Sequence, residues 1–331
     1  MTTTATQNAH RSRLERFFRD GVAEPVPVIC RLPQDEYLDA TDAAFQAWLE
    51  ASLGALLPRR AEAENPLTFR PWMIEFWPLG VHFVDLLFGA TVSCQDGQFW
   101  ADYLKLPMEQ LTAPALEESQ PVRWMLACMH SALARMPEDM MLTTPVFSSP
   151  LNILVNLYGP AAVEAFGAPD ARLAGAIAAV RDTIAGLHRL VRREFPSPRV
   201  RHYAASHRFT PDGFGHICGC TTHLLGPQAY AALVAPADEA ILRVYPEGGT
   251  IHLCGHHTQH IPCWRRMEAL RGVQLNDAAA DDFADYFKGL RPDQILYVTP
   301  TEAMPIERIL SISGGRRIVL QALLDRPIPC S

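Results

Sequence analysis

The sequence lacks the long apolar run that a membrane-spanning helix requires. A helix needs about 20 mostly apolar residues to cross a bilayer, and no such stretch occurs in this chain. The first residues are polar and rich in threonine, so the apolar centre of a signal peptide is missing as well. We therefore expect a cytoplasmic protein that does not enter a membrane.

An excess of basic residues is also absent. The chain carries 29 Lys and Arg against 36 Asp and Glu, which gives a formal net charge of -7. General nucleic-acid binders show a basic surface, so this balance argues against that class. The glycine-rich signatures of dinucleotide sites and of phosphate-binding loops do not occur either. Nucleotide chemistry therefore has no support in the sequence.

Linkers and internal repeats are missing too, which favours one folded domain. The chain has 331 residues, of which 48% are hydrophobic and 20% charged, as in ordinary globular proteins. We expect residues 1–10 to be a disordered tail and residues 11–331 to form the domain. Leu14, Phe17 and Phe18 recur at helical spacing, which predicts an N-terminal helix that ends near Gly21.

The second half of the chain alternates short apolar strands with helices. Strands are predicted at residues 272–277 and 295–299, and helices at residues 264–270, 278–289 and 305–312. This alternation is typical of parallel β/α units. Similar segments in the first half bring the number of units to roughly eight, as in a TIM barrel of about 250 residues with additions. The expected fold class is α/β, a single (β/α)8 TIM barrel with an N-terminal helical extension.

The stretch from Gly249 to Cys263 holds a high density of metal-binding side chains. Residues 250–253 are predicted to form a short buried strand, and Gly255 allows a turn just after it. His252 and Cys254 are two residues apart, so in a strand both side chains point to the same side. An imidazole and a thiolate at the carboxyl end of a strand are two of the three protein ligands of a catalytic zinc ion. The alternative is a chance pairing in a histidine-rich loop.

Four of the eight cysteines lie between residues 218 and 263, beside histidines. In a cytosolic protein such clustering favours metal binding over disulfides. Cys218 and Cys220 are too close in sequence for an unstrained bridge, so both are expected to be reduced. Their segment, residues 216–223, precedes the helix that leads to the His252 strand. It could supply further ligands or substrate contacts, or it could be a glycine-rich turn with small buried cysteines.

Two acidic residues follow the later strands. Asp277 could act as a general acid or base, could orient a ligand, or could cap the helix after it. Glu302 could be an oxygen ligand or a carboxylate at a helix start. The carboxyl ends of the strands of a β/α barrel form one face, so both residues would lie near His252. The flanking histidines are expected to be mostly loop or helix-start residues: His256, His257 and His260.

Together these residues resemble the uroporphyrinogen decarboxylase superfamily. The similarity covers nearly the whole chain and is specific in its second half. It rests on residues 13–28, Pro227 to Pro236, Ile251 to Gly255, Val273 to Asp277 and Pro305 to Ile309. The resemblance implies one uroporphyrinogen decarboxylase-like barrel domain over residues 11–331.

The superfamily contains two chemistries. The decarboxylase branch holds the propionates of its substrate with an arginine-rich segment after the first strand. Here that position reads Cys30-Arg31-Leu32-Pro33, which argues against a porphyrin substrate. The other branch contains zinc methyltransferases that carry His-x-Cys-Gly, matched here by residues 252–255. The third ligand of that branch is a later cysteine, and the aligned position near Val298 has none.

The resemblance therefore implies a zinc-dependent methyltransferase-like enzyme. It would move a methyl group between a thiol and either a small methyl donor or a corrinoid on a partner protein. His252 and Cys254 would hold the zinc ion. The missing ligand would come from Cys220, then Glu302, then Cys330 in order of preference, with Cys263 as a further soft donor.

Two other hypotheses stay open. The protein could be a metal-independent decarboxylase or lyase that acts on a small acid. It could also be a non-catalytic barrel that binds a metal or a corrinoid protein. In the enzymatic readings Asp277 is the candidate acid or base, the substrate is a small molecule, and the chain is a monomer or a homodimer.

Overall fold

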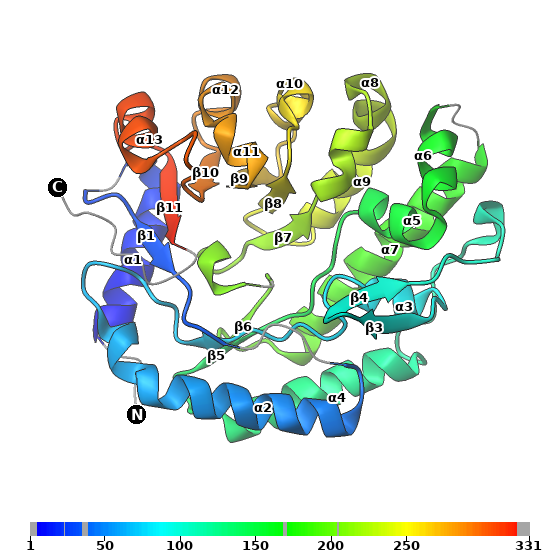
Figure 1. The fold of residues 1–331 in the computed structure, drawn as a ribbon, viewed down its shortest axis with the longest axis horizontal. Coiled ribbons are helices and arrows are strands. Elements are labelled where there is room, and N and C mark those ends of the chain that lie inside the picture. Colours follow the sequence, from blue (N-terminus) through cyan, green and yellow to red (C-terminus); the bar gives the residue numbers. More distant parts are fainter. Residues whose placement is uncertain (1–4, 23, 35–38, 168–170, 204, 323–331) are drawn as a thin grey trace.

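Parallel strands and their helices are arranged around a common centre in the computed structural model (Figure 1). The structure describes residues 5–22, 24–34, 39–167, 171–203 and 205–322. Within these residues, none of the helices is long and apolar enough to cross a membrane. The prediction of an α/β protein built mainly on parallel strands is confirmed.

Six parallel strands form the larger sheet. In spatial order they are β1 (Val28–Cys30), β11 (Ile318–Ala322), β10 (Ile295–Val298), β9 (Leu270–Asn276), β8 (Gly249–Cys254) and β7 (Gly215–Cys218). From β7 to β11 the strands lie side by side in the order in which they occur in the chain. A connection between two parallel neighbours has to cross over the sheet, and helices form these crossovers. These helices are α8 (Pro227–Ala229), the π-helix η5 (Tyr230–Val234), α9 (Ala235–Leu242), α10 (Ile261–Trp264), α11 (Ala278–Asp281), α12 (Phe283–Gly289) and α13 (Ile306–Ser313).

A second parallel sheet contains β2 (Met73–Ile74), β5 (Met141–Thr143) and β6 (Val200–Arg201). The helices of this half are α2 (Asp42–Leu56), α3 (Phe83–Leu87), α4 (Gln120–Arg135), α5 (Pro150–Tyr158), α6 (Pro160–Gly167) and α7 (Ala171–Glu194). The two sheets meet where Ile29 of β1 forms a parallel bridge with Phe69, just before β2. No ladder pairs β6 with β7 in the part of the chain that the structure describes.

The chain between β6 and β7 contacts both sheets. It contains the short 3-10 helix η3 (Ser206–Arg208). The backbone N–H of Ser206 donates to Glu75, which follows β2, at 2.7 Å. The carbonyl oxygen of His207 accepts from the side chain of Gln321 on β11 at 2.6 Å. This segment therefore lies between the sheets on their inner side.

Helix α1 (Ala5–Asp20) begins earlier than the sequence predicted. Residues 5–10 are helical, which differs from the disordered tail expected there, and the rest of that predicted tail, residues 1–4, lies outside the described residues. Gln7 and His10 are buried there. The His10 ring lies 2.8 Å from the carbonyl oxygen of Asn65, and the Gln7 amide donates to that of Arg70 at 3.0 Å. These contacts come from residues far along the chain, so the local sequence does not reveal them.

An inner apolar cluster joins the two sheets and helix α1. Its members come from α1, from inner faces of strands in both sheets, and from the segment before β7: Leu14, Phe17, Phe18, Ile29, Phe69, Met73, Met141, Tyr203, Phe209, Phe214, Ile295, Tyr297 and Val319. Because one cluster collects side chains from both sheets, their inner faces look toward each other. Burial of each large apolar side chain contributes about 1.5–3 kcal/mol to stability.

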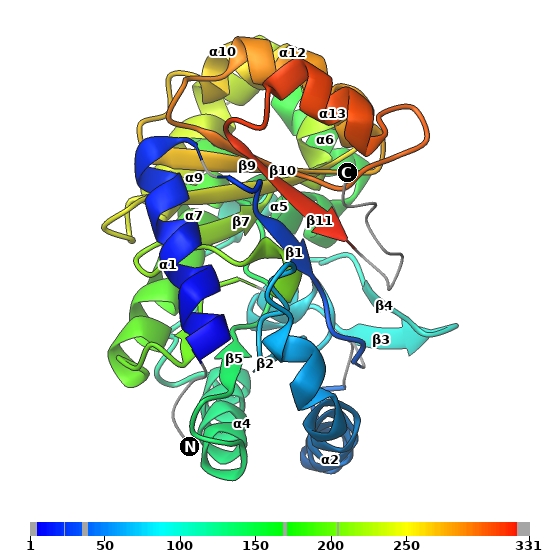
Figure 2. The same cartoon turned by 90° about the vertical axis from the view of Figure 1, so that its left-hand side faces the viewer.

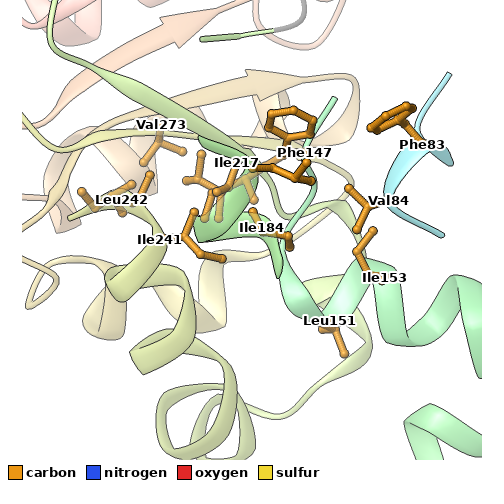
Figure 3. Close-up of a cluster of buried hydrophobic side chains, with 14 of the residues drawn as sticks. Phe83, Val84, Phe147, Leu151, Ile153, Ile184, Ile217, Ile241, Leu242 and Val273 are labelled. Atoms are coloured by element: carbon orange, nitrogen blue, oxygen red, sulfur yellow. The ribbon is translucent and has the colours of Figure 1, made fainter. Parts of the chain in front are cut away.

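The main core lies between the strands and the surrounding helices (Figure 3). Ile217 of β7 and Val273 of β9 point into it, together with Ile241 and Leu242 of α9. Ile251 and Leu253 of β8 belong to the same core. Side chains alternate along a strand, so His252 points to the inner side of the sheet. The outer core thus orients the candidate metal-binding residue.

Two local predictions differ from the structure. Residues 215–218 form strand β7, where the sequence suggested a turn-rich segment before a helix. Residues 264–270 are not one helix, because α10 ends at Trp264 and β9 begins at Leu270. The buried amide of Gln294 donates to the carbonyl oxygens of both Trp264 and Leu270 at 2.9 Å, which holds this connection in place.

A tight turn lies at Asp96 and Gly97. It joins β3 (Val92–Gln95) to β4 (Gln98–Ala101) in an antiparallel hairpin that projects from the body in Figure 2. Both turn residues have positive φ angles, 51° at Asp96 and 78° at Gly97. Such angles suit a two-residue hairpin turn.

Candidate metal centre

Two neighbouring strands bring a group of sulfur and nitrogen donors together. Cys218 ends β7 and pairs in register with His252 of β8. Cys220 begins the 3-10 helix η4 (Cys220–Leu224) after β7, and Cys254 ends β8. All four side chains therefore lie at the carboxyl ends of adjacent parallel strands, where binding sites of such sheets usually lie.

The donor atoms of this group are close enough for one ion. One ligand atom each from Cys218, Cys220 and His252 all lie within 4.8 Å of one another. The two sulfurs of Cys218 and Cys220 are 3.5 Å apart, and both cysteines are free. The Cys254 sulfur lies 3.1 Å from Nε2 of His252. Soft thiolate and imidazole ligands are those that zinc prefers.

A chain of side-chain amides fixes the orientation of the His252 ring. Nδ1 of His252 donates to the side-chain oxygen of Gln274 on β9. The Gln274 amide donates to Gln321 of β11 at 2.8 Å, and Gln321 in turn donates to the carbonyl oxygen of His207. Because Nδ1 carries the proton, Nε2 offers its lone pair toward the sulfurs. Partners of this kind behind a histidine ligand orient the ring and set its tautomer.

Hydrogen bonds among the cysteines share negative charge across the cluster. The hydrogen bond with Cys220 lowers the pKa of Cys254, and the nearby His252 and Asn276 lower it further against the effect of burial. The hydrogen bond with Cys220 also lowers the pKa of Cys218. Conversely, the hydrogen bonds of Cys220 with Cys218 and Cys254 raise the pKa of Cys220. Cys220 therefore keeps its thiol proton between two sulfurs that lose their protons more easily, and a bound cation would take the place of that proton.

Asp277 stands next to this cluster at the end of β9. The side-chain amide of Asn276 donates to Asp277 at 2.9 Å and to the Cys254 sulfur at 3.7 Å. Burial, and then the neighbouring Cys254, raise the pKa of Asp277. Its backbone has φ 47° and ψ -132°, and its side chain makes no capping bond to α11. A non-glycine residue in this region is strained, and strain of this kind concentrates at functional sites.

Glu302 and Cys263 do not join this group of donors. Glu302 is exposed on the loop after β10. Cys263 lies in α10 with its side chain buried in the main core, and burial raises the pKa of its thiol. Within the described residues, neither belongs to the set that could share an ion with His252. Cys330, the third candidate from the sequence, lies outside the described residues.

The neighbouring histidines have other partners. His256 is exposed and lies 2.7 Å from the carboxylate of Asp282. His223 contacts the carbonyl oxygen of Cys220 at 2.6 Å. His257 contacts the carbonyl oxygen of Cys254 at 2.5 Å, and His260 contacts that of Thr222 at 2.8 Å. None of these contacts is to a sulfur atom of the cluster.

Arg31 directly follows strand β1 and is partly buried. Its guanidinium forms an ion pair at 2.7 Å with Glu75, whose side chain is fully buried. It also lies over the ring of Trp77, 5.8 Å from the centroid. Its charge is therefore matched within the protein, and the exclusion of a porphyrin substrate stays a prediction.

The sequence did not single out Cys218 as a member of the cluster, nor Gln274 and Gln321 as its support. A signal was present, because residues 215–218 alternate apolar and metal-binding side chains as residues 249–254 do. Reading both segments as strands would have placed their cysteines side by side. The glutamines carry no such signal, since their role depends on strand register.

A solved structure shares this fold. The chain is similar to a methyltransferase from Methanosarcina mazei, with a TM-score of 0.63 over 95% of this chain and 92% of that one. The sequence identity is 11%, so the similarity concerns the fold alone. No protein-family model matches the sequence, and no curated protein matches it.

Proposed function

We propose that this protein is a zinc-dependent enzyme that transfers a methyl group to a thiol. The observation that carries the proposal is the group of Cys218, Cys220 and His252 at the carboxyl ends of two parallel strands. A shared fold with a methyltransferase supports it by analogy. The strands would close a (β/α)8 barrel, in which this face is the usual place for an active site.

His252 and Cys220 are the central ligands of the proposed site. Each lies close to both remaining sulfurs, those of Cys218 and Cys254. A catalytic zinc ion takes three protein ligands and keeps one position open. Cys254 is the better third ligand because it is half-buried, whereas Cys218 is 7% exposed and lies deeper in the sheet. Zinc, when bound, would keep the sulfur of a thiol substrate deprotonated near neutral pH.

The protein's own residues have separate tasks in this proposal. Gln274 holds the His252 ring through its hydrogen bond to Nδ1. Asn276 contacts both Cys254 and the carboxyl group of Asp277. Asp277, whose pKa is raised by burial and by Cys254, would accept or return the proton of the substrate thiol. The methyl donor would be a corrinoid on a partner protein or a small molecule.

Elemental analysis combined with a methyl-transfer assay tests the proposal. Protein purified without chelator should contain about one zinc ion per chain and should methylate a thiol when given methylcobalamin. Metal-free wild type that decarboxylates a small acid would instead support the lyase. Protein that binds zinc, retains a corrinoid protein and shows no turnover would support the non-catalytic alternative.

A further inference from the structure

The loops that carry Cys220 and Cys254 are joined by a buried set of hydrogen bonds. Thr222 follows Cys220 by two residues, and His257 follows Cys254 by three. The Thr222 hydroxyl lies 2.9 Å from Nδ1 of His257, and both residues are fully buried. Nε2 of the same ring contacts the carbonyl oxygen of Cys254 at 2.5 Å. One imidazole thus spans from the Cys220 loop to the backbone of the Cys254 strand.

The direction of each bond follows from the chemistry of a neutral imidazole. A carbonyl oxygen can only accept, so Nε2 of His257 carries the proton and donates to Cys254. Nδ1 is then bare and faces the hydroxyl of Thr222, whose single proton lies within reach of both Nδ1 and the carbonyl oxygen of Gly219, each at 2.9 Å. A second bond reinforces the first, because Nε2 of His260 donates to the carbonyl oxygen of Thr222 at 2.8 Å. The Thr222 loop is therefore held through both its side chain and its backbone.

A rigid aromatic layer supports these histidines from behind. The ring of His260 lies 4.5 Å from that of Tyr230, centroid to centroid. The Tyr230 hydroxyl accepts from the indole of Trp264 at 2.8 Å and donates to Asp238 at 2.9 Å. Trp264, Tyr230 and Asp238 are all fully buried. The histidines therefore have little freedom to move away from the two loops.

We propose that Thr222 and His257 form a clamp that sets the separation of the Cys220 and Cys254 sulfurs. They are positioning residues, since neither reaches a sulfur itself. The clamp gives a structural role to the histidine-rich loop after Cys254, whose histidines contact carbonyl oxygens and a carboxylate instead of the sulfur atoms. This inference rests on the proposed function where it concerns metal binding. The clamp also implies that the Cys220 and Cys254 sulfurs are held close together in the metal-free chain, and this can be tested separately.

Cobalt binding is the first test. In Thr222→Val the hydroxyl is replaced by a methyl group of similar size, so its contacts with His257 and with the carbonyl oxygen of Gly219 are both lost, whereas His257→Gln leaves the Gly219 contact in place. We expect affinity for Co²⁺, measured by competition with a chelator, to fall about 10–100-fold, with weaker sulfur-to-cobalt charge-transfer bands. Thr222→Ser keeps the hydroxyl and should restore both. His256→Ala is the control, because His256 is exposed and pairs with Asp282 outside the clamp.

Thiol cross-linking of the metal-free chain is the second test. Diamide oxidises two thiols to a disulfide and is itself reduced to the hydrazine. Peptide mapping should find less Cys220–Cys254 bridge in Thr222→Val and His257→Gln than in wild type or Thr222→Ser. Thermal unfolding identifies a variant that has not folded. Unchanged bridging and unchanged cobalt binding in both variants would overturn the clamp. Wild type that binds no metal would refute the proposed function, and the bridging yield would then decide on the clamp.

Discussion

His252 donates through Nδ1 to the side-chain oxygen of Gln274, so Nε2 of the same ring faces the sulfur of Cys254. The two residues come from adjacent strands, and the register pairs His252 directly with Gln274. The tautomer that a metal ligand needs is therefore set by strand pairing. This relationship supports a metal at His252 more strongly than the spacing of His252 and Cys254 in the sequence does.

Loss of this hydrogen bond should weaken metal binding. Gln274→Leu keeps the approximate volume but removes the acceptor for Nδ1, so the ring and its tautomer are no longer fixed. We expect metal affinity to fall about 10–100-fold. Gln274→Glu retains an acceptor and should lose less. Chelator competition measures the difference, and equal affinity in Gln274→Leu and wild type would show that Gln274 does not orient the ligand.

Substitution of single cysteines should reveal which sulfurs hold the metal. Cys220→Ser and Cys254→Ala should each lower the zinc content well below that of wild type, because each removes a soft ligand. Elemental analysis after gel filtration gives the zinc content.

Two variants complete this comparison. Cys94→Ser is the matched control, since Cys94 is exposed on the β3–β4 hairpin away from the cluster. Glu302→Gln should keep its zinc, because Glu302 is exposed and lies outside the group of donors. Loss of zinc in Glu302→Gln with retention in Cys220→Ser would reverse the proposed order of ligands.

Cys218 and Cys220 should carry free thiols in freshly prepared protein. Their sulfurs are 3.5 Å apart, well beyond the bond length of about 2 Å in a disulfide. After unfolding and alkylation without reductant, mass spectrometry should find both residues labelled. A Cys218–Cys220 bridge in the same sample would contradict this prediction and indicate a redox role for the pair.

Asp238 should make stability depend on pH. Burial raises its pKa to about 7, well above the value near 4 that an aspartate has in an unfolded chain. Between about pH 4 and pH 7 the folded state keeps a proton that the unfolded state loses. The contribution of Asp238 to stability should therefore fall as pH rises through this window, by at most about 1.4 kcal/mol per pH unit, while buried histidines with lowered pKa values, such as His188 and His202, contribute with the opposite sign.

Denaturant unfolding at several pH values measures this slope. Asp238→Asn cannot ionise, so the difference in stability between this variant and wild type should change with pH between about pH 4 and pH 7. Asp285→Asn, at an exposed position of α12, is the control and should keep the slope of the wild type. Identical pH dependence in Asp238→Asn and wild type would show that Asp238 does not hold its proton over this range.

The sequence determined the class of fold and the position of the candidate site. Alternation of apolar strands and helices in the second half predicted parallel β/α units, and β8, β9 and β10 lie within about two residues of their predicted bounds. This was possible because side-chain periodicity is a local property. His252 and Cys254 were named from residue type and spacing, and Cys220 as the replacement for a ligand that the resemblance implied; the structure places both sulfurs close to His252.

The tertiary structure alone decided which further residues surround them. Cys218 joins the group because β7 is a strand paired in register with β8, and Gln274 and Gln321 support His252 because β9 and β11 lie in the same sheet. Glu302 ranked second after Cys220 as a donor in the sequence and lies outside the group. Strand register and loop path depend on contacts between distant residues, as between Thr222 and His257. Local sequence cannot specify these contacts, because their energy arises when the whole chain packs.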